Sequence, residues 1–141
     1  MIGGDVAQQQ RPELIDVGPT HVLTAMQMRR VIDPEAGPAL EMELRDDVVN
    51  PHGSLHGGLM GALIECGAAG CAVGAGGSEN IVASDMLIRF LSVVKVGPAR
   101  AVSRVIRTGR RSIVVQCDVI DAGDNRKLVA SATLSYARLD T

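Results

Sequence analysis

The chain has 141 residues, of which 46% are hydrophobic and 21% charged, and its formal net charge is −2. This length fits one globular domain that folds without disulfide bonds. The weak net charge gives no general attraction to nucleic acid or to an anionic membrane, and one Phe with one Tyr offers no stacking platform for bases. We therefore expect no nucleic-acid partner and no membrane partner.

The cysteine usage and the N-terminus indicate the compartment. Cys66, Cys71 and Cys117 are an odd number without the pair spacing of a metal site, and free thiols of this kind are typical of a reducing environment. The first residues lack the basic start and the apolar run of a secretion signal. We expect a cytoplasmic protein, with residues 1–12 as a flexible tail and residues 13–141 as one domain.

Two extended segments are predicted early in the folded region, at 20–32 and 38–45. In the second, Leu40, Met42 and Leu44 alternate with charged residues, which is the period-two pattern of a half-buried strand. The Asp-Pro and Gly-Pro pairs between the segments predict a turn.

Residues 55–73 are small and apolar apart from Glu65, and their length predicts a buried helix that ends in the glycine-rich stretch 74–78. The run is close to the length of a membrane span, and its glycines have the spacing of helix-packing motifs in membranes. The central carboxylate of Glu65 and the low hydrophobicity of Gly and Ala favour a helix enclosed by a sheet instead.

Four strand-like runs follow, at about 81–94, 99–108, 112–121 and 127–138. The links between them are short and polar, which predicts antiparallel neighbours. The expected fold class is therefore α+β, with one long helix packed against an antiparallel sheet of about five to six strands.

The stretch NPHGSLHGG, residues 50–58, first suggests a metal site because it holds two histidines. His52 and His56 are four residues apart, a spacing that would place both on one face of a helix. Pro51 and Gly53 disfavour a regular helix there, and no third histidine ligand is nearby. We predict no metal and no cofactor. The helix cysteines lack a basic neighbour and are expected to be small buried hydrophobes.

Glu65 is the strongest candidate for chemistry. It is the only acidic residue between Val49 and Ser78, and it lies next to Ile64 and Cys66. At least partial desolvation is therefore expected, which suits a general base. An exposed helix stripe that happens to be acidic is the alternative, and the properties of Glu65 alone do not choose between them.

His56, Gly57 and Gly58 fall in the first turn of the predicted helix. Backbone N–H groups there have no intrahelical partner, and the helix dipole is positive. A carbonyl oxygen placed against the Gly57 amide would have its developing negative charge stabilised. Asn50 offers a side-chain amide to hold a water or a carbonyl. The alternative is a plain helix start with a glycine-rich cap.

The spacing of Gly57 and Glu65 has a consequence for assembly. Eight residues span roughly 12 Å along a helix axis. An oxyanion donor and a base that act on one carbonyl both lie about 3 Å from the reacting atoms. One helix cannot supply both groups, whereas two antiparallel helices of a two-fold dimer can. We predict a shared site in which Gly57 and Asn50 of one chain face the other chain's glutamate.

In these residues the chain resembles the hotdog-fold acyl-CoA thioesterases of the phenylacetic-acid-pathway and 4-hydroxybenzoyl-CoA type, over roughly residues 20–138. The resemblance lies in Asn50, in His56-Gly57-Gly58, and in an acid eight residues after Gly57. Further stretches that fit are 84–91, 95–97, 108–111 and 127–133. The resemblance implies a hotdog fold, hydrolysis of an acyl-CoA to free acid and CoA, and a homodimer or a dimer of dimers.

The resemblance also implies roles for the site residues. The Gly57 amide would polarise the thioester carbonyl, Asn50 would position the carbonyl or the water, and Glu65 would act as general base or as nucleophile. His56 would orient the loop near the carbonyl, and Gly58 would contact the substrate.

Two hairpin arginines, Arg110 and Arg111, are candidates for the CoA phosphates, since Arg forks match phosphate oxygens; solvated turn arginines are the equal alternative. The chain also departs from its relatives. Many carry Asp where this chain has Glu65, and the helper hydroxyl of some falls at Ala69 or Ala83, which have none. A non-catalytic protein that binds acyl-CoA or another small ligand is therefore the alternative function.

Overall fold

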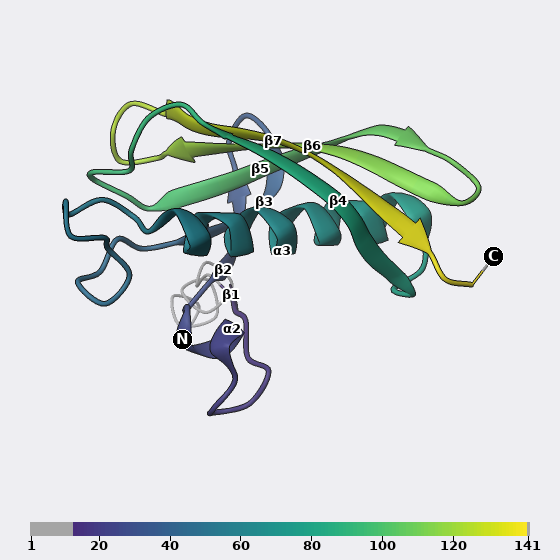
Figure 1. The fold of residues 1–141 in the computed structure, drawn as a ribbon, viewed down its shortest axis with the longest axis horizontal. Helices are drawn as coiled ribbons and strands as arrows, with labels where there is room; N and C mark the ends of the chain where they lie inside the picture. The colour runs from purple at the N-terminus through teal and green to yellow at the C-terminus, as the bar shows by residue number, and fades with distance from the viewer. Residues whose placement is uncertain (1–12, 141) are drawn as a thin grey trace, which may run out of the picture.

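The computed structural model describes residues 13–140, and the expected tail at residues 1–12 lies outside them. One long helix, α3 (Gly57–Gly76), lies along one face of an antiparallel sheet with the strand order β1-β2-β3-β5-β6-β7-β4 (Figure 1). The strands are β1 (Glu13–Leu14), β2 (Arg29–Asp33), β3 (Gly37–Met42), β4 (Ile81–Phe90), β5 (Ala99–Thr108), β6 (Ser112–Asp121) and β7 (Lys127–Arg138). The predicted α+β hotdog fold is confirmed, and the seventh strand is the two-residue β1.

The segment predicted as a strand over 20–32 is only partly a strand. It begins with a short helix, α2 (Val22–Ala25), whose first turn is capped by His21: Nδ1 accepts from the Leu23 N–H at 3.1 Å. Gln27 follows with a φ of 54°, a left-handed conformation that turns the chain into β2. Local capping overrides the strand propensity here.

Helix α3 begins two residues later and ends three residues later than predicted, because residues 74–76 continue it. It ends at Gly77, whose φ of 73° and whose N–H bond to the Val73 carbonyl form a left-handed C-cap. The core lies between α3 and the central strands β5 and β6. Gly67 allows this close packing, since a Cβ there would lie 3.1 Å from the Ala101 Cβ. The side chains fully buried at this contact include Leu63, Ile64, Ala68, Ile113, Val115 and Val119.

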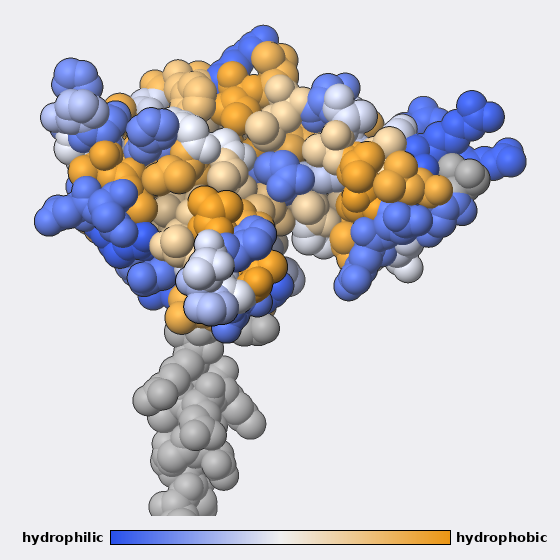
Figure 2. Space-filling model, turned by 60° about the horizontal axis from the view of Figure 1, so that its bottom comes forward, coloured by the Kyte–Doolittle hydropathy of each residue, from blue (hydrophilic) through white to orange (hydrophobic). Residues whose placement is uncertain are grey.

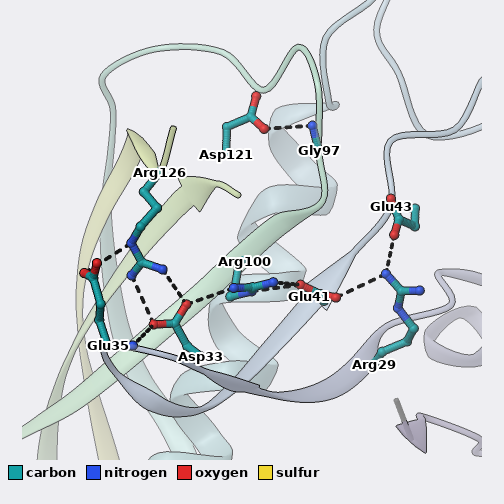
Figure 3. A network of polar contacts seen from close by, with 9 residues as sticks. All are labelled: Arg29, Asp33, Glu35, Glu41, Glu43, Gly97, Arg100, Asp121 and Arg126. Carbon is teal, nitrogen blue, oxygen red and sulfur yellow. Dashed lines mark hydrogen bonds and ion pairs between the residues drawn. The ribbon is translucent and has the colours of Figure 1, made fainter. Parts of the chain in front are cut away.

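A buried ion network holds the β2–β3 hairpin against the rest of the sheet (Figure 3). The Asp33 carboxylate accepts from Arg126 at 2.8 and 3.0 Å and from Arg100 at 2.9 Å. Arg100 also bonds Glu41, which in turn accepts from Arg29 at 3.2 Å. The guanidinium of Arg126, and after it that of Arg100, hold the pKa of Asp33 well below its usual range. The hairpin is therefore fixed to β5 and to the β6–β7 turn.

One side of α3 is open within a single chain. Of the described helices, α3 alone is long and apolar enough to cross a membrane, a test that the core helix of a sheet also passes. Of an apolar stretch of 18 residues within α3, only 33% are buried by the rest of the chain. Figure 2 brings the bottom of Figure 1, where α3 lies, toward the viewer and shows hydrophobic residues on both sides of a hollow. Exposed apolar surfaces of soluble proteins often mark a binding site for a ligand or for another chain.

Strand β4 is the other uncovered feature. It lies at the edge of the sheet and pairs with β7 alone among the described strands. Its apolar side chains are well exposed, with Met86 at 42%, Leu87 at 61% and Phe90 at 55%. A long edge strand with exposed apolar side chains is a surface that soluble proteins normally cover.

Candidate active site

Asn50 organises the loop that leads into α3. Its Oδ1 accepts from the backbone N–H of His52 at 2.9 Å and of Ser54 at 3.2 Å, and its Nδ2 donates to the Ser54 Oγ at 2.9 Å. Gly53 supplies the positive φ of 80° that this tight turn requires. Asn50 thus shapes the approach to the helix, and its contact with substrate or water stays a prediction. His52 is an exposed loop residue.

His56 is the N-cap of α3. Its Nδ1 accepts from the Gly58 N–H at 2.9 Å, so the proton of the neutral ring lies on Nε2. Within residues 13–140 the Gly57 N–H makes no hydrogen bond. The cap therefore occupies one first-turn amide and leaves the neighbouring one at the positive end of the helix dipole. This selects Gly57 over Gly58 as a donor to a ligand.

The first turn of α3 opens onto a pocket of about 700 Å³ between α3 and β4. The helix positions that line it share one face, since Gly57, Gly61 and Glu65 recur every four residues. The pocket is lined by His56, Gly57, Gly58, Gly61, Ala62, Glu65, Met86, Ile88 and Phe90. The structure thus brings together four of the predicted site residues, and Asn50 is not in the lining.

The two glycines of the first turn leave different amounts of room. A Cβ at Gly57 would lie 3.6 Å from the Phe90 ring, an ordinary contact. A Cβ at Gly58 would lie 3.0 Å from Cε1 and 3.1 Å from Nδ1 of His56. A side chain at Gly58 would therefore push against the histidine cap, whereas one at Gly57 would fill the pocket beneath Phe90.

Glu65 is half-buried and is held through its backbone, whose carbonyl accepts from the Tyr136 hydroxyl at 2.8 Å. Its neighbour Cys66 lies in surroundings that disfavour a thiolate. Burial, and after it the charge of Glu65, raise the pKa of the Cys66 thiol to about 11. Burial also raises the pKa of Cys71. On this part of α3 the carboxylate of Glu65 therefore stays the candidate for chemistry, and its role stays a prediction.

The hairpin arginines lie at the other end of the helix. Arg110 and Arg111 are exposed in the β5–β6 turn, and the Arg111 carbonyl accepts from the Arg138 N–H at 2.9 Å. The Arg138 side chain donates to the carbonyl of Gly76, the last residue of α3, at 3.4 Å. Figure 1 shows this turn and the start of α3 at opposite ends of the molecule. One chain therefore does not bring these arginines to Gly57.

Six residues at the site were not foreseen: Gly61 and Ala62 on α3, Met86, Ile88 and Phe90 on β4, and Tyr136 on β7. The alternation of the β4 side chains was a usable signal for one strand face. Neither helper position supplies a hydroxyl, and the nearby Ser84 donates its own to the Ser135 carbonyl at 3.1 Å. Within residues 13–140, no three His, Cys, Asp or Glu side chains are grouped to hold a metal ion.

Comparison with known proteins gives a family and a fold. A sequence profile described as the thioesterase superfamily matches residues 52–127. No curated protein sequence matches the chain. Its structure is similar to a thioesterase from Haemophilus influenzae, with a TM-score of 0.73 and 22% identity over 82% of that chain and 84% of this one.

Two further solved structures are similar at the level of the fold. A Pseudomonas aeruginosa thioesterase variant has a TM-score of 0.72 and 20% identity over 88% of that chain and 94% of this one. A Bacillus halodurans protein solved with CoA has a TM-score of 0.70 and 22% identity over 83% of that chain and 96% of this one.

Proposed function

The chain belongs to the thioesterase superfamily, and we propose that it hydrolyses the thioester of an acyl-CoA to a free acid and CoA. The observation that carries the proposal is the start of α3, where His56 occupies the Gly58 amide and leaves the Gly57 N–H open to a pocket that also holds Glu65. The CoA bound in the Bacillus halodurans neighbour supports CoA as the carrier.

In the proposed reaction the substrate carbonyl oxygen accepts a hydrogen bond from the Gly57 N–H. Water attacks the carbonyl carbon while the carboxylate of Glu65 of the partner subunit takes a proton from it, and the C=O electrons move onto the oxygen that the amide stabilises. When the carbonyl re-forms, the C–S bond breaks and the CoA sulfur receives the proton from Glu65. The products are one carboxylic acid and one thiol.

Direct attack by Glu65 is the alternative for the first step. It would form an anhydride with release of CoA, and water would then hydrolyse the anhydride. A single turnover in ¹⁸O-labelled water separates the routes. If Glu65 acts as general base, every molecule of product acid contains one oxygen from the labelled water. If Glu65 acts as nucleophile and water attacks the glutamyl carbonyl of the anhydride, the first product acid contains an unlabelled oxygen from Glu65 instead.

We propose that the site is completed by a second copy. Antiparallel pairing that sets Gly57 opposite Glu65 of the partner subunit is centred on Gly61, which has no side chain to keep the helices apart. The open face of α3 and the exposed apolar side chains of the β4 edge support a second chain as the cover. Light scattering should therefore find a dimer or a multiple of it, and a monomer would contradict the proposal.

Mixing two inactive variants tests the shared site directly. Gly57→Pro removes the N–H at a helix position that accepts proline, and Glu65→Gln removes the base. In a heterodimer of the two, one of the two sites has both groups intact. Since about half of the randomly mixed dimers are heterodimers, the mixture should recover about a quarter of wild-type activity. If both groups act within one chain, the mixture stays inactive. Gly57→Ala, which keeps the N–H, is the control.

Thiol release from a panel of acyl-CoAs tests the activity. Loss of general acid–base catalysis typically costs about 10²–10⁴ in rate, and we expect a loss of that size in kcat for Glu65→Gln. A variant as fast as the wild type would contradict the role of Glu65. The aromatic phenylacetyl-CoA and 4-hydroxybenzoyl-CoA belong in the panel because the sequence resembles enzymes of that type.

Arg110 and Arg111 are proposed to bind the CoA phosphates. The last turn of α3, near these arginines, lies roughly 16 Å along the axis from Glu65, and the pantetheine arm of CoA separates thioester and phosphates. Replacing both arginines with glutamine should raise KM for an acyl-CoA and leave KM for the matching acyl-pantetheine unchanged, because that substrate lacks the phosphates. An equal change for both substrates would contradict this role.

A non-catalytic acyl-CoA-binding protein is the second candidate. It is favoured by the alanines at positions 69 and 83, which leave no helper hydroxyl, and by the Ser84 hydroxyl being bonded within the sheet. Binding of acyl-CoA by calorimetry without any thiol release would establish it in place of the hydrolase.

A further inference from the structure

A second and larger hollow adjoins Glu65 on another side of α3. It has a volume of about 1310 Å³ and lies between the C-terminal half of α3 and the β2–β3 hairpin. Glu65 lines both this hollow, which we call the α3–β3 groove, and the pocket beside Gly57. The walls that matter here are Ala69, Gly70, Val73 and Gly74 on α3 and, facing them, Met28 and Leu40. A group attached at the Glu65 end can therefore extend into the groove.

The chemistry of the α3–β3 groove is aliphatic. Phe90 and Tyr136 are the only aromatic residues of the chain, and neither lines the groove, so an aromatic acyl group would find no ring to stack on. Besides Glu65, the charged residues that line it are Arg30 and Glu79, which are both exposed and so belong to its outer edge. Ser103 adds one hydroxyl to the lining, and most of the other interior side chains are apolar. The interior therefore suits an alkyl chain, whose burial is favourable in proportion to its apolar surface.

The length of the α3–β3 groove limits the length of the acyl chain that it can hold. From Glu65 to Gly74 the helix rises roughly 13 Å. Carbon–carbon bonds of about 1.5 Å give an extended alkyl chain an advance of roughly 1.25 Å per carbon. We propose that the α3–β3 groove binds the acyl chain and that the substrates are linear aliphatic acyl-CoAs of about eight to ten carbons. This inference rests on the proposed thioesterase function and adds the substrate class.

Gly70 and Gly74 are the residues that keep the groove open. A Cβ at either position would meet no other atom within 4 Å, whereas Gly67 is needed for packing against Ala101. Glycine weakens a helix relative to alanine, so helix stability does not explain either residue. Larger side chains at Gly70 and Gly74 would shorten the groove at roughly 7 and 13 Å from Glu65.

The experiment measures kcat/KM for straight-chain acyl-CoAs of increasing length, with phenylacetyl-CoA beside them. For the wild type we expect a gain of roughly fourfold per added CH₂ up to about ten carbons. In Gly70→Leu the gain should stop at about six carbons, and in Gly74→Leu at about eight to ten. Ala75→Leu is the matched control, since Ala75 is exposed on α3 and lines neither hollow. Circular dichroism checks folding, and Gly70→Ala provides a milder variant.

A wrong assignment of the groove and a wrong assignment of the thioesterase function give different experimental results. If Glu65→Gln is inactive but the chain-length profile is the same in all variants, or if phenylacetyl-CoA is preferred, the groove inference is wrong and the thioesterase function stands. If Gly70→Leu changes the oligomeric state by light scattering without changing the profile, the groove is a contact between copies, which also overturns the inference.

Binding of non-hydrolysable S-alkyl-CoA thioethers tests whether the groove holds the alkyl chain, even if no acyl-CoA is cleaved. By calorimetry, S-decyl-CoA should bind the wild type more tightly than S-butyl-CoA, and Gly70→Leu should remove most of that difference. Equal affinities of the two thioethers for the wild type would overturn the inference.

Discussion

The hydroxyl of Tyr136 donates a hydrogen bond to the backbone carbonyl of Glu65 at 2.8 Å. The tyrosine comes from β7 and is buried to 1% exposure, whereas the carbonyl lies in the middle of α3. A mid-helix carbonyl already accepts an N–H from the next turn, so the tyrosine adds a second, tertiary bond. Strand and helix are thereby tied together at the residue that we propose as the base.

Tyr136→Phe tests the role of this hydrogen bond. The substitution keeps the ring and removes only the hydroxyl, so the packing is retained and one buried hydrogen bond is lost. We expect the free energy of unfolding to fall by about 1 kcal/mol and Tm by about 3–5 °C. We also expect a lower kcat with little change in KM, because Glu65 is positioned less well. Calorimetry and steady-state kinetics give both numbers, and an unchanged kcat would mean that the bond serves stability alone.

The same residue predicts loss of stability in alkali. Burial, and after it the charge of Glu65, raise the pKa of Tyr136 above its ordinary value. The folded state therefore holds the phenol proton more tightly than the unfolded state. The contribution of the protonated Tyr136 phenol to the free energy of unfolding is fully present below about pH 10 and is lost as the pH rises further. Since the chain has one tyrosine, tyrosinate absorbance reports it cleanly and should rise only with unfolding. A rise in the folded protein near pH 10 would refute this.

Two variants of His56 distinguish its role as the helix cap from a direct contact with the substrate. His56→Ala leaves the Gly58 N–H without its acceptor and should lower the free energy of unfolding by about 1 kcal/mol. His56→Asn restores a side chain that caps helices well, so we expect it to recover the stability and most of kcat. Chemical denaturation and kinetics measure both. Recovery of stability with kcat still low would assign His56 a direct contact with the substrate.

The start of α3 shows how far sequence reasoning reaches. The sequence predicted that Gly57 and Glu65 lie on one helix, roughly 12 Å apart along its axis, because helix geometry is local and is written in the sequence. The Gly57 amide was predicted as the donor from the sequence, but the reason that Gly58 does not compete, its bond to His56, depends on the rotamer of His56 and is not written in the sequence. Short polar links predicted that β5, β6 and β7 are antiparallel neighbours, and the sheet confirms this. The same prediction was wrong for β4, because the link at 91–98 crosses the sheet and β4 pairs with β7 instead of β5. The short helix α2 at 22–25 depends on a cap that strand propensity does not report.

The residues from other strands could not be foreseen for a related reason. Phe90 reaches Gly57, and Tyr136 reaches Glu65, only because the sheet register and the height of α3 above it are set by the whole core. A strand pattern predicts which residues share a face and not which helix residue they meet. The α3–β3 groove is likewise absent from any local pattern, since its two walls are α3 and a hairpin that is fixed by the buried Asp33.

The thiol of Cys66 should be almost unreactive at neutral pH. Its pKa is raised to about 11 by burial and by the neighbouring Glu65 charge, so the thiolate is scarce below that pH. Labelling with a maleimide, read by mass spectrometry, should be slow at pH 8 and accelerate steadily toward pH 11. Glu65→Gln removes the charge and should shift this profile to lower pH, while burial keeps it above that of a free thiol. Equal profiles for both proteins would show that Glu65 does not act on Cys66.

The network around Asp33 predicts a defined loss of stability in acid. Removing one partner of a buried ion pair costs about 3–5 kcal/mol, but the side chains of Arg100 and Arg126 are 18% and 29% exposed, so for Asp33→Asn we expect about 2 kcal/mol. Because Arg126 and Arg100 hold the pKa of Asp33 down, its contribution is present above the unfolded pKa of about 4 and is lost as the pH falls below it. Urea unfolding from pH 7 to pH 2 should therefore show the two proteins converging in acid.

The matched control for this network is Glu35→Gln. The Glu35 side chain also pairs with Arg126, at 3.2 Å, but it is 70% exposed. Water screens such a pair, so its removal should change the free energy of unfolding far less than Asp33→Asn does. Equal losses for the two variants would mean that burial of the Asp33 carboxylate is not what gives the network its strength. Curves for Asp33→Asn and the wild type that stay parallel below pH 4 would show that Asp33 titrates in its ordinary range.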